Sequence, residues 1–167
     1  MKNPPLLRGA TKWASALGLL CIPRTAEAQY SGNIDSGYYL LPGLTTSTVM
    51  HRTGKVSGFL GGEVSLAYVD GRNATWYGGY FDAGYDFGSK GTRVSLGPEY
   101  GYYYCGVDGG LLLEERATGW GKGFVARGYA TIGVAAIYAR YGQVVTDDRD
   151  RFFELGLLLK LPGYLGH

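Results

Sequence analysis

The feature that most constrains the fold of this chain is an alternation of apolar and polar residues with a period of two. This period places successive side chains on opposite faces of a β-strand, whereas an amphipathic helix repeats every 3.6 residues. The alternation occurs in eight segments of about 9 to 14 residues, close to the length of a tilted membrane-crossing strand. The segments are 38–50, 56–69, 75–87, 92–104, 107–115, 124–132, 134–143 and 151–161. We therefore expect an all-β fold of eight strands.

Each expected strand has one apolar face and one face that carries its charges. In the segment 56–69, Val64 and Leu66 alternate with Glu63 and Ser65. The last segment sets four leucines against a glutamate and a lysine in the same way. Because a soluble sandwich and a membrane barrel both alternate, the facing of the two sides has to be decided by other features.

The connections and the aromatic residues favour a membrane barrel. Longer polar connections (51–55, 88–91, 116–123 and 144–150) alternate with candidate tight turns (71–72, 105–106 and 133–134). An up-and-down barrel with both termini in the periplasm has this order, with long loops outside and short turns inside. In that arrangement, aromatic residues gather near both rims: Tyr38, Tyr68, Tyr77, Tyr102, Tyr104 and Tyr164 at one, and Tyr85, Phe87, Phe124, Tyr141 and Phe153 at the other. Two such girdles predict that the apolar face meets lipid.

The first 28 residues have the three parts of a secretory signal peptide. Lys2, Arg8 and Lys12 precede an apolar run over 13–22, and Ala26-Glu27-Ala28 provides a cleavage site before Gln29. The apolar run is about ten residues, which is too short for a spanning helix. We expect three parts: a signal peptide over 1–28, an N-terminal tail over 29–37, and the barrel over 38–167. The sequence therefore predicts export to the bacterial outer membrane.

Removal of this signal makes the chain nearly neutral and leaves one cysteine. The signal contains four of the 16 basic residues and one of the 14 acidic residues. The basic balance of the full chain thus belongs to the signal, and nucleic-acid binding is not implied. With Cys105 alone remaining, an internal disulfide is excluded.

The last expected strand ends in a specific pattern, Glu154-x-Gly156-x-x-Leu159-x-Leu161. This pattern resembles the signal by which bacterial assembly machinery recognises the last strand of outer-membrane proteins. It departs from that signal in position, because six further residues follow Leu161 where such barrels normally end on an aromatic residue. Over 38–161 the chain resembles, in architecture, the small eight-stranded outer-membrane barrels of the OmpA and OmpX type. The resemblance implies a transmembrane barrel, here without a peptidoglycan-binding domain after it.

A barrel of eight strands is just wide enough for its own side chains to fill, so we expect a polar plug. The inward-facing network is predicted to contain Glu63, Asp82, Arg93, Glu99, Arg127, Arg140, Glu154 and Lys160. Asp86 faces the same way. Buried charges are costly unless paired, and facing and depth suggest Glu99 with Arg127 and Glu154 with Arg140. A narrow ion or proton path is the alternative, because polar groups at membrane depth can mark function.

Enzymatic activity is not predicted, although small outer-membrane barrels include lipid A deacylases and palmitoyltransferases. Such enzymes need a histidine base beside a serine and a carboxylate. The chain has two histidines, His51 in the first long loop and His167 at the end, with Ser47 and Ser89 the nearest loop serines to His51. The sequence indicates neither a metal site nor a cofactor, and the run Asp147–Asp150 is interpreted as a solvated hairpin tip.

The expected partners are the outer-membrane lipid, lipopolysaccharide and the barrel-assembly machinery. Five basic residues are predicted on the outer side, where lipopolysaccharide phosphates would meet them: Arg52, Lys55, Lys90, Arg116 and Lys122. The predicted function is a monomeric, non-enzymatic barrel with a structural role or an interaction role through its loops. The runner-up is a secreted soluble barrel that binds a small apolar ligand, as lipocalins do, with its leucines and tyrosines turned inward.

Overall fold

A computed structural model describes residues 35–116, 119–146 and 151–166. The predicted signal peptide, its cleavage site and the Asp147–Asp150 tip lie outside these residues. Within them the fold is all-β, and no helix is long and apolar enough to cross a membrane. The strands are β1 (Gly37–His51), β2 (Val56–Asp70), β3 (Thr75–Asp86), β4 (Gly91–Tyr102), β5 (Cys105–Arg116), β6 (Gly119–Ile132), β7 (Ala135–Val144), β8 (Arg151–Lys160) and β9 (Gly163–Gly166).

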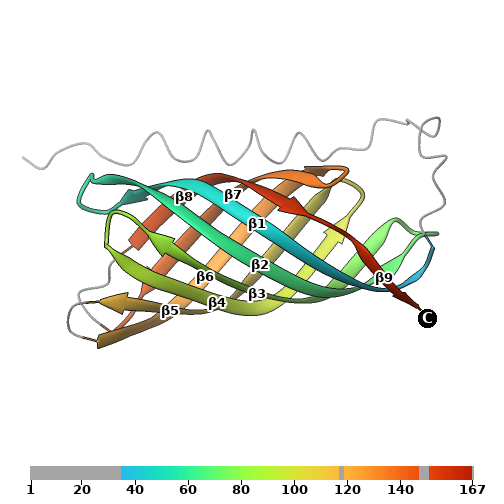
Figure 1. Cartoon of the computed structure of the whole chain (residues 1–167), viewed down its shortest axis with the longest axis horizontal. Helices are drawn as coiled ribbons and strands as arrows, with labels where there is room; N and C mark the ends of the chain where they lie inside the picture. Colours follow the sequence, from blue (N-terminus) through green and yellow to red (C-terminus); the bar gives the residue numbers. More distant parts are fainter. Residues whose placement is uncertain (1–34, 117–118, 147–150, 167) are drawn as a thin grey trace, which may run out of the picture. The chain divides into compact units, whose positions relative to one another are not determined.

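The eight predicted strands are confirmed, and they close into an up-and-down barrel (Figure 1). Each strand from β1 to β8 pairs antiparallel with the next, and β8 pairs with β1 from Gly43↔Lys160 to His51↔Phe152. The neighbours of every strand in the wall are thus its neighbours in sequence, apart from this closing pair. The oblique course of the strands is visible in Figure 1.

The stagger of the strands fixes the width of the barrel. A path through directly paired residues runs from Tyr38 to Tyr68, Tyr77, Tyr100, Val107, Gly128, Ala139 and Leu155 and returns to β1 at Thr48, ten residues further on. With standard strand spacings, eight strands and this stagger give a tilt of about 40° and a backbone radius of about 8 Å. Such a cylinder can be filled by side chains alone.

The connections define two ends of the barrel. We call the end with residues 52–55, 87–90 and 145–146 the loop end, and the end with residues 71–74, 103–104 and 133–134 the turn end. The turn predicted at Cys105-Gly106 is wrong, because both residues are in β5 and the connection is Tyr103-Tyr104. Tyr103 adopts a φ of 51°, so a residue type that rarely enters the left-handed region makes this turn.

The short strand β9 was not expected, and it continues β8 along β1. Pro162 lacks a backbone N–H, which interrupts the strand after the Leu161 N–H has donated to the Pro42 carbonyl (2.9 Å). Pairing then resumes with Leu40↔Gly163 and Tyr39↔Tyr164. The last strand therefore extends past the predicted assembly motif and brings Tyr164 against Tyr39, with ring centroids 5.1 Å apart.

The observed facing agrees with the predicted alternation. On β2, Val64 and Leu66 are exposed on the outer wall, whereas Glu63 and Ser65 are buried inside. Apolar residues also enter the interior, in one cluster near the loop end and one towards the turn end. The first contains Val49, Phe59, Leu112, Val125, Val144 and Phe152, and the second contains Tyr129, Ala136, Tyr138 and Leu158 with Trp76 packed against it.

Candidate functional site

The candidate site is the ion-paired interior of the barrel, together with the polar cluster that closes its loop end. The structure places all eight predicted network residues inside the wall. Seven of them are at most 4 % exposed, namely Glu63, Asp82, Arg93, Glu99, Arg127, Arg140 and Glu154. Lys160 is only partly buried. Alternation of facing along the strands is what brings these charges together.

Each of the four interior cations reaches across the barrel to the opposite wall. Arg127 on β6 contacts Glu63 on β2, and Arg140 on β7 contacts Asp82 on β3 at 2.9 Å. Arg93 on β4 donates to Glu154 on β8 at 2.8 Å, and Lys160 on β8 lies 3.0 Å from Glu99 on β4. In an eight-stranded barrel, strands four apart are diametrically opposite. Each of these ion pairs therefore connects opposite sides of the barrel across its interior.

The predicted pairing of Glu99 with Arg127 is wrong, and the register shows why. Glu99 pairs directly with Asp108 across β4 and β5, and Asp108 pairs directly with Arg127 across β5 and β6. Asp108 thus stands between the two residues, and its Oδ2 accepts from Arg127 Nε at 2.6 Å. Glu99 accepts from Lys160 instead, and Lys160 also lies 2.8 Å from Glu63.

The predicted pairing of Glu154 with Arg140 is present as a long contact. The two residues are direct partners across β7 and β8, with Arg140 Nη1 3.9 Å from Glu154 Oε2. The closer partners of Glu154 are Arg93 and two hydroxyls that donate to Oε1, those of Ser47 at 2.6 Å and Tyr138 at 3.2 Å. Glu154 therefore joins the middle of the network to its loop end.

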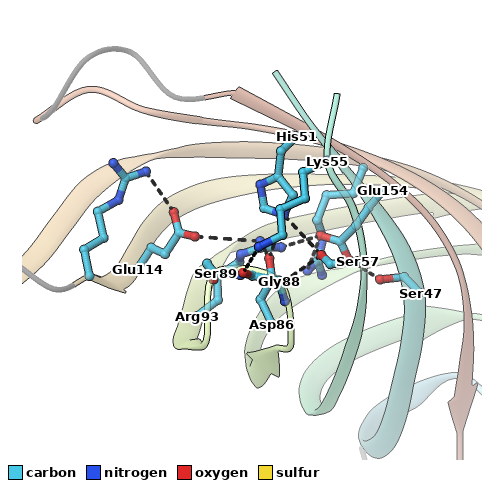
Figure 2. A network of polar contacts seen from close by, with 12 residues as sticks. Ser47, His51, Lys55, Ser57, Asp86, Gly88, Ser89, Arg93, Glu114 and Glu154 are labelled. Carbon is cyan, nitrogen blue, oxygen red and sulfur yellow. Dashed lines mark hydrogen bonds and ion pairs between the residues drawn. The ribbon is translucent and has the colours of Figure 1, made fainter. Parts of the chain in front are cut away.

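Asp86 organises the cluster at the loop end (Figure 2). Its Oδ1 accepts from the Ser57 hydroxyl (2.8 Å) and from the backbone N–H groups of Gly88 (2.7 Å) and Ser89 (3.3 Å). Its Oδ2 accepts from Arg93 at 2.7 Å. One buried carboxylate thus fixes the connection between β3 and β4 and anchors an arginine below it.

Arg93 is held by aromatic contacts as well as by carboxylates. Its guanidinium lies 3.8 Å from the centroid of Phe152 and 5.3 Å from that of Phe59. A third carboxylate, Glu114 on β5, lies 3.9 Å from Arg93 and also accepts from Arg116 at 3.2 Å. Flat guanidinium groups suit such stacking and forked ion pairing together.

His51 lies at the top of this cluster, but its serine partner is Ser57 rather than Ser47 or Ser89. The His51 Nε2 is 3.1 Å from the Ser57 Oγ and 3.3 Å from Asp86 Oδ2. The Ser57 hydroxyl donates to Asp86, so its proton does not point to the imidazole. In a Ser-His-Asp triad, the serine hydroxyl donates to one ring nitrogen of the histidine, and the other ring nitrogen contacts the carboxylate. Here the single atom His51 Nε2 lies near both groups. The group has the residues of a triad without its connectivity.

Two network members, Asp108 and Glu114, were missed from the sequence. Both are buried, at 7 % and 4 % exposure, and both lie on β5. The signal was available in the sequence, because Val107, Leu111 and Leu113 alternate with Asp108 and Glu114, so an outward apolar face places both carboxylates inside. With them, the described interior has seven buried carboxylates facing four cations.

The packing around Gly156 explains why the predicted assembly motif has a glycine at this position. Gly156 is the direct partner of Tyr138, and a Cβ at this position would lie 2.7 Å from the Tyr138 ring and 2.4 Å from the Thr46 carbonyl oxygen. Glu154 faces inward from the same strand, whereas Leu159 and Leu161 are exposed outside. Recognition of this strand by assembly machinery stays a prediction.

The predicted basic residues of the loop end have different surroundings. The Lys55 ammonium donates to the Gly88 carbonyl at 2.6 Å, which ties the first loop to the second, and Arg116 is paired with Glu114. Arg52, Lys90 and Lys122 are exposed. Within the described ranges, no group of three His, Cys, Asp or Glu residues is arranged to hold a metal ion.

No protein-family model matches the chain, and comparisons with curated proteins and with solved structures find no significant match. The resemblance to OmpA and OmpX therefore rests on architecture, which the closed antiparallel barrel of eight strands supports.

Proposed function

We propose that this protein is an outer-membrane β-barrel with a structural role, or an interaction role through its loops, and with an ion-paired interior. The observation that carries the proposal is the chemistry of the outer wall. Among the described strand residues, charged side chains on the outward face occur only near strand ends, at Asp70, Glu115, Lys122 and Arg151. Between these ends the wall is an uninterrupted uncharged band.

The height of this band suits a bilayer. On β2 the uncharged outward residues run from Val56 to Tyr68, and on β8 from Phe153 to Leu161. At the tilt derived above, these stretches cover roughly 20 to 30 Å along the barrel axis, against an apolar band of about 25 Å in known barrels. Aromatic contacts border the band at both ends: Tyr38 with Tyr68 at the turn end (5.3 Å), and Tyr85 with Phe87 at the loop end (5.4 Å).

The proposal includes the route to the membrane. The signal peptide exports the chain, and the motif from Glu154 to Leu161 directs it to the assembly machinery. Loops then face outward and short turns face the periplasm, as in other barrels of this architecture.

Two alternatives, a soluble carrier and a narrow pore, predict different results in cell fractionation, gel mobility and conductance measurements. A secreted soluble barrel with an apolar ligand would have to accommodate that ligand among the crossing ion pairs. A narrow pore would have to pass ions through those pairs. We also propose that the barrel is not an enzyme; the donation from the Ser57 hydroxyl to Asp86 argues against serine-hydrolase chemistry at this cluster.

Gel mobility and cell fractionation test the proposal directly. We expect the protein in the outer-membrane fraction, and a folded band that shifts on boiling in detergent. A detergent-free monomer in the periplasm, with no heat-dependent shift, would support the soluble carrier instead. Discrete conductance in planar bilayers would support the pore, and the absence of conductance would rule out the pore.

A further inference from the structure

A continuous outward-facing ladder follows the seam where β8 closes onto β1, two strands that lie side by side in Figure 1. From the loop end downwards its rungs are Arg52 with Arg151, Met50 with Phe153, Thr48 with Leu155, Thr46 with Leu157, and Leu44 with Leu159. The pair Arg52 with Arg151 is cationic, and the pairs below it are uncharged. The seam is therefore complementary to an anionic lipid, with cations at the level of the headgroup and an apolar surface below them.

The lower part of the seam contains a hollow in the outer wall. The hollow has a volume of about 290 Å³, and its lining includes the exposed residues Leu44, Thr46, Leu60, Ala135, Leu157 and Leu159. The buried residues between them on the same strands, Thr45, Ala136 and Leu158, complete the lining. Its origin is local, because the threonines of β1 are short and Gly62 of β2, the partner of Leu44, has no side chain. Leucines on β2 and β8, whose side chains are longer, border this strip on both sides.

Two arginines are held side by side above the hollow. The Arg52 N–H donates to the Arg151 carbonyl at 3.0 Å, and both residues are exposed. Neither side chain has a hydrogen bond or ion pair with another residue in the part of the chain that the structure describes. Two arginines on hydrogen-bonded backbone positions can present guanidinium N–H donors that suit the oxygens of a phosphate group.

The spacing between the arginines and the hollow matches one leaflet. Six residues separate Arg151 from Leu157, which is about 20 Å of strand and about 15 Å of depth at the tilt of this barrel. Half of a hydrocarbon core of about 30 Å is the same distance. An acyl chain whose headgroup lies at the arginines would therefore end in the hollow.

We propose that the β1–β8 seam binds one molecule of lipopolysaccharide, with a phosphate between Arg52 and Arg151 and an acyl chain along Thr48 and Thr46 into the hollow. This inference rests on the proposed function, since it needs the loop end to lie in the outer leaflet. It assigns a specific lipid site to one side of the barrel, separate from the basic residues of the other loops.

Native mass spectrometry of the refolded full-length mature chain tests the site. Lipid A, the phosphorylated and acylated anchor of lipopolysaccharide, is titrated into neutral detergent micelles that hold the barrel. We expect one retained lipid A, with an affinity at least about tenfold weaker in the double variant Arg52→Gln/Arg151→Gln, because charge-assisted bonds to phosphate are lost. Thr46→Trp, which fills the groove, should weaken retention to a similar extent.

Matched controls keep the result specific. Arg72→Gln removes an exposed cation at the turn end of the barrel, away from the seam arginines, and Ala126→Trp adds bulk to the outer face of β6; both should bind like the parent. The inference is overturned if Arg72→Gln weakens retention as much as the arginine pair, if Thr46→Trp has no effect, or if phosphatidylglycerol is retained equally. Heat-dependent gel mobility of the same samples tests the proposed membrane barrel separately. A protein whose folded band shifts on boiling but which shows no preference for lipid A refutes only the seam site.

Discussion

Replacing Arg93 with methionine should destabilise the barrel more than any comparable change of an exposed arginine. Arg93 is 1 % exposed and donates to Asp86 at 2.7 Å and to Glu154 at 2.8 Å. Methionine keeps much of the apolar contact with Phe152 but leaves two buried carboxylates without their main counter-charge. Breaking a buried pair in this way typically costs about 3–5 kcal/mol.

The contacts that remain place the expected cost near the lower limit. Glu154 keeps the hydroxyls of Ser47 (2.6 Å) and Tyr138 (3.2 Å) and the long contact with Arg140 (3.9 Å). Asp86 keeps Ser57, the N–H groups of its own loop and His51 at 3.3 Å. We therefore expect a loss of about 3 kcal/mol in the free energy of unfolding. Urea unfolding in lipid vesicles, followed by tryptophan fluorescence, measures this quantity.

A double-mutant cycle isolates the ion pair from the lost packing. Adding Glu154→Gln to Arg93→Met should recover at least about 1 kcal/mol, because the uncompensated charge is then removed. Arg72→Met makes the same chemical change at an exposed turn and should stay within about 0.5 kcal/mol of the parent. A cost below about 1 kcal/mol for Arg93→Met, or simple additivity in the cycle, would refute the role assigned to this arginine.

Three further outcomes are expected. Leu157→Arg, on the outward face of β8, should cost about 2–4 kcal/mol in bilayers if this face meets lipid, and a gain in detergent-free solubility would contradict that facing. Gly97→Ala should cost about 1–3 kcal/mol in urea unfolding because its Cβ would lie 2.0 Å from the Gly109 carbonyl oxygen, whereas Gly128→Ala, with open space around it, should be neutral. A fluorophosphonate probe should leave Ser57 unlabelled, and stoichiometric labelling would show a nucleophile after all.

The strands and their facing could be predicted because both depend on local alternation. A one-residue slip would turn Glu63 outward and Val64 inward, so burial fixes the register of each strand strongly. The turn at Tyr103-Tyr104 could not be found in this way. Its residues lack the glycine or asparagine that usually marks a two-residue hairpin, and the nearby Cys105-Gly106 looked more suitable.

The partners inside the barrel could not be predicted, because they depend on depth as well as facing. Alternation shows that Glu99 and Arg127 both point inward, but the stagger of ten residues decides which inward groups share a level. Asp108 occupies the position between them and takes Arg127. The same stagger aligns Arg140 with Asp82 across the barrel, a contact between residues 58 apart in sequence.

The crossing ion pairs also explain how a small barrel with a single cysteine among its described residues can hold a defined shape. Hydrogen bonds in the wall connect only neighbouring strands, and by themselves they would leave the cross-section free to flatten. The pairs Arg127 with Glu63, Arg140 with Asp82, and Arg93 with Glu154 connect opposite strands and resist that deformation in several directions. The same pairs lie inside the barrel, so ions that pass along its interior would meet them. The groups that connect opposite strands are therefore also the groups that a permeating ion would contact.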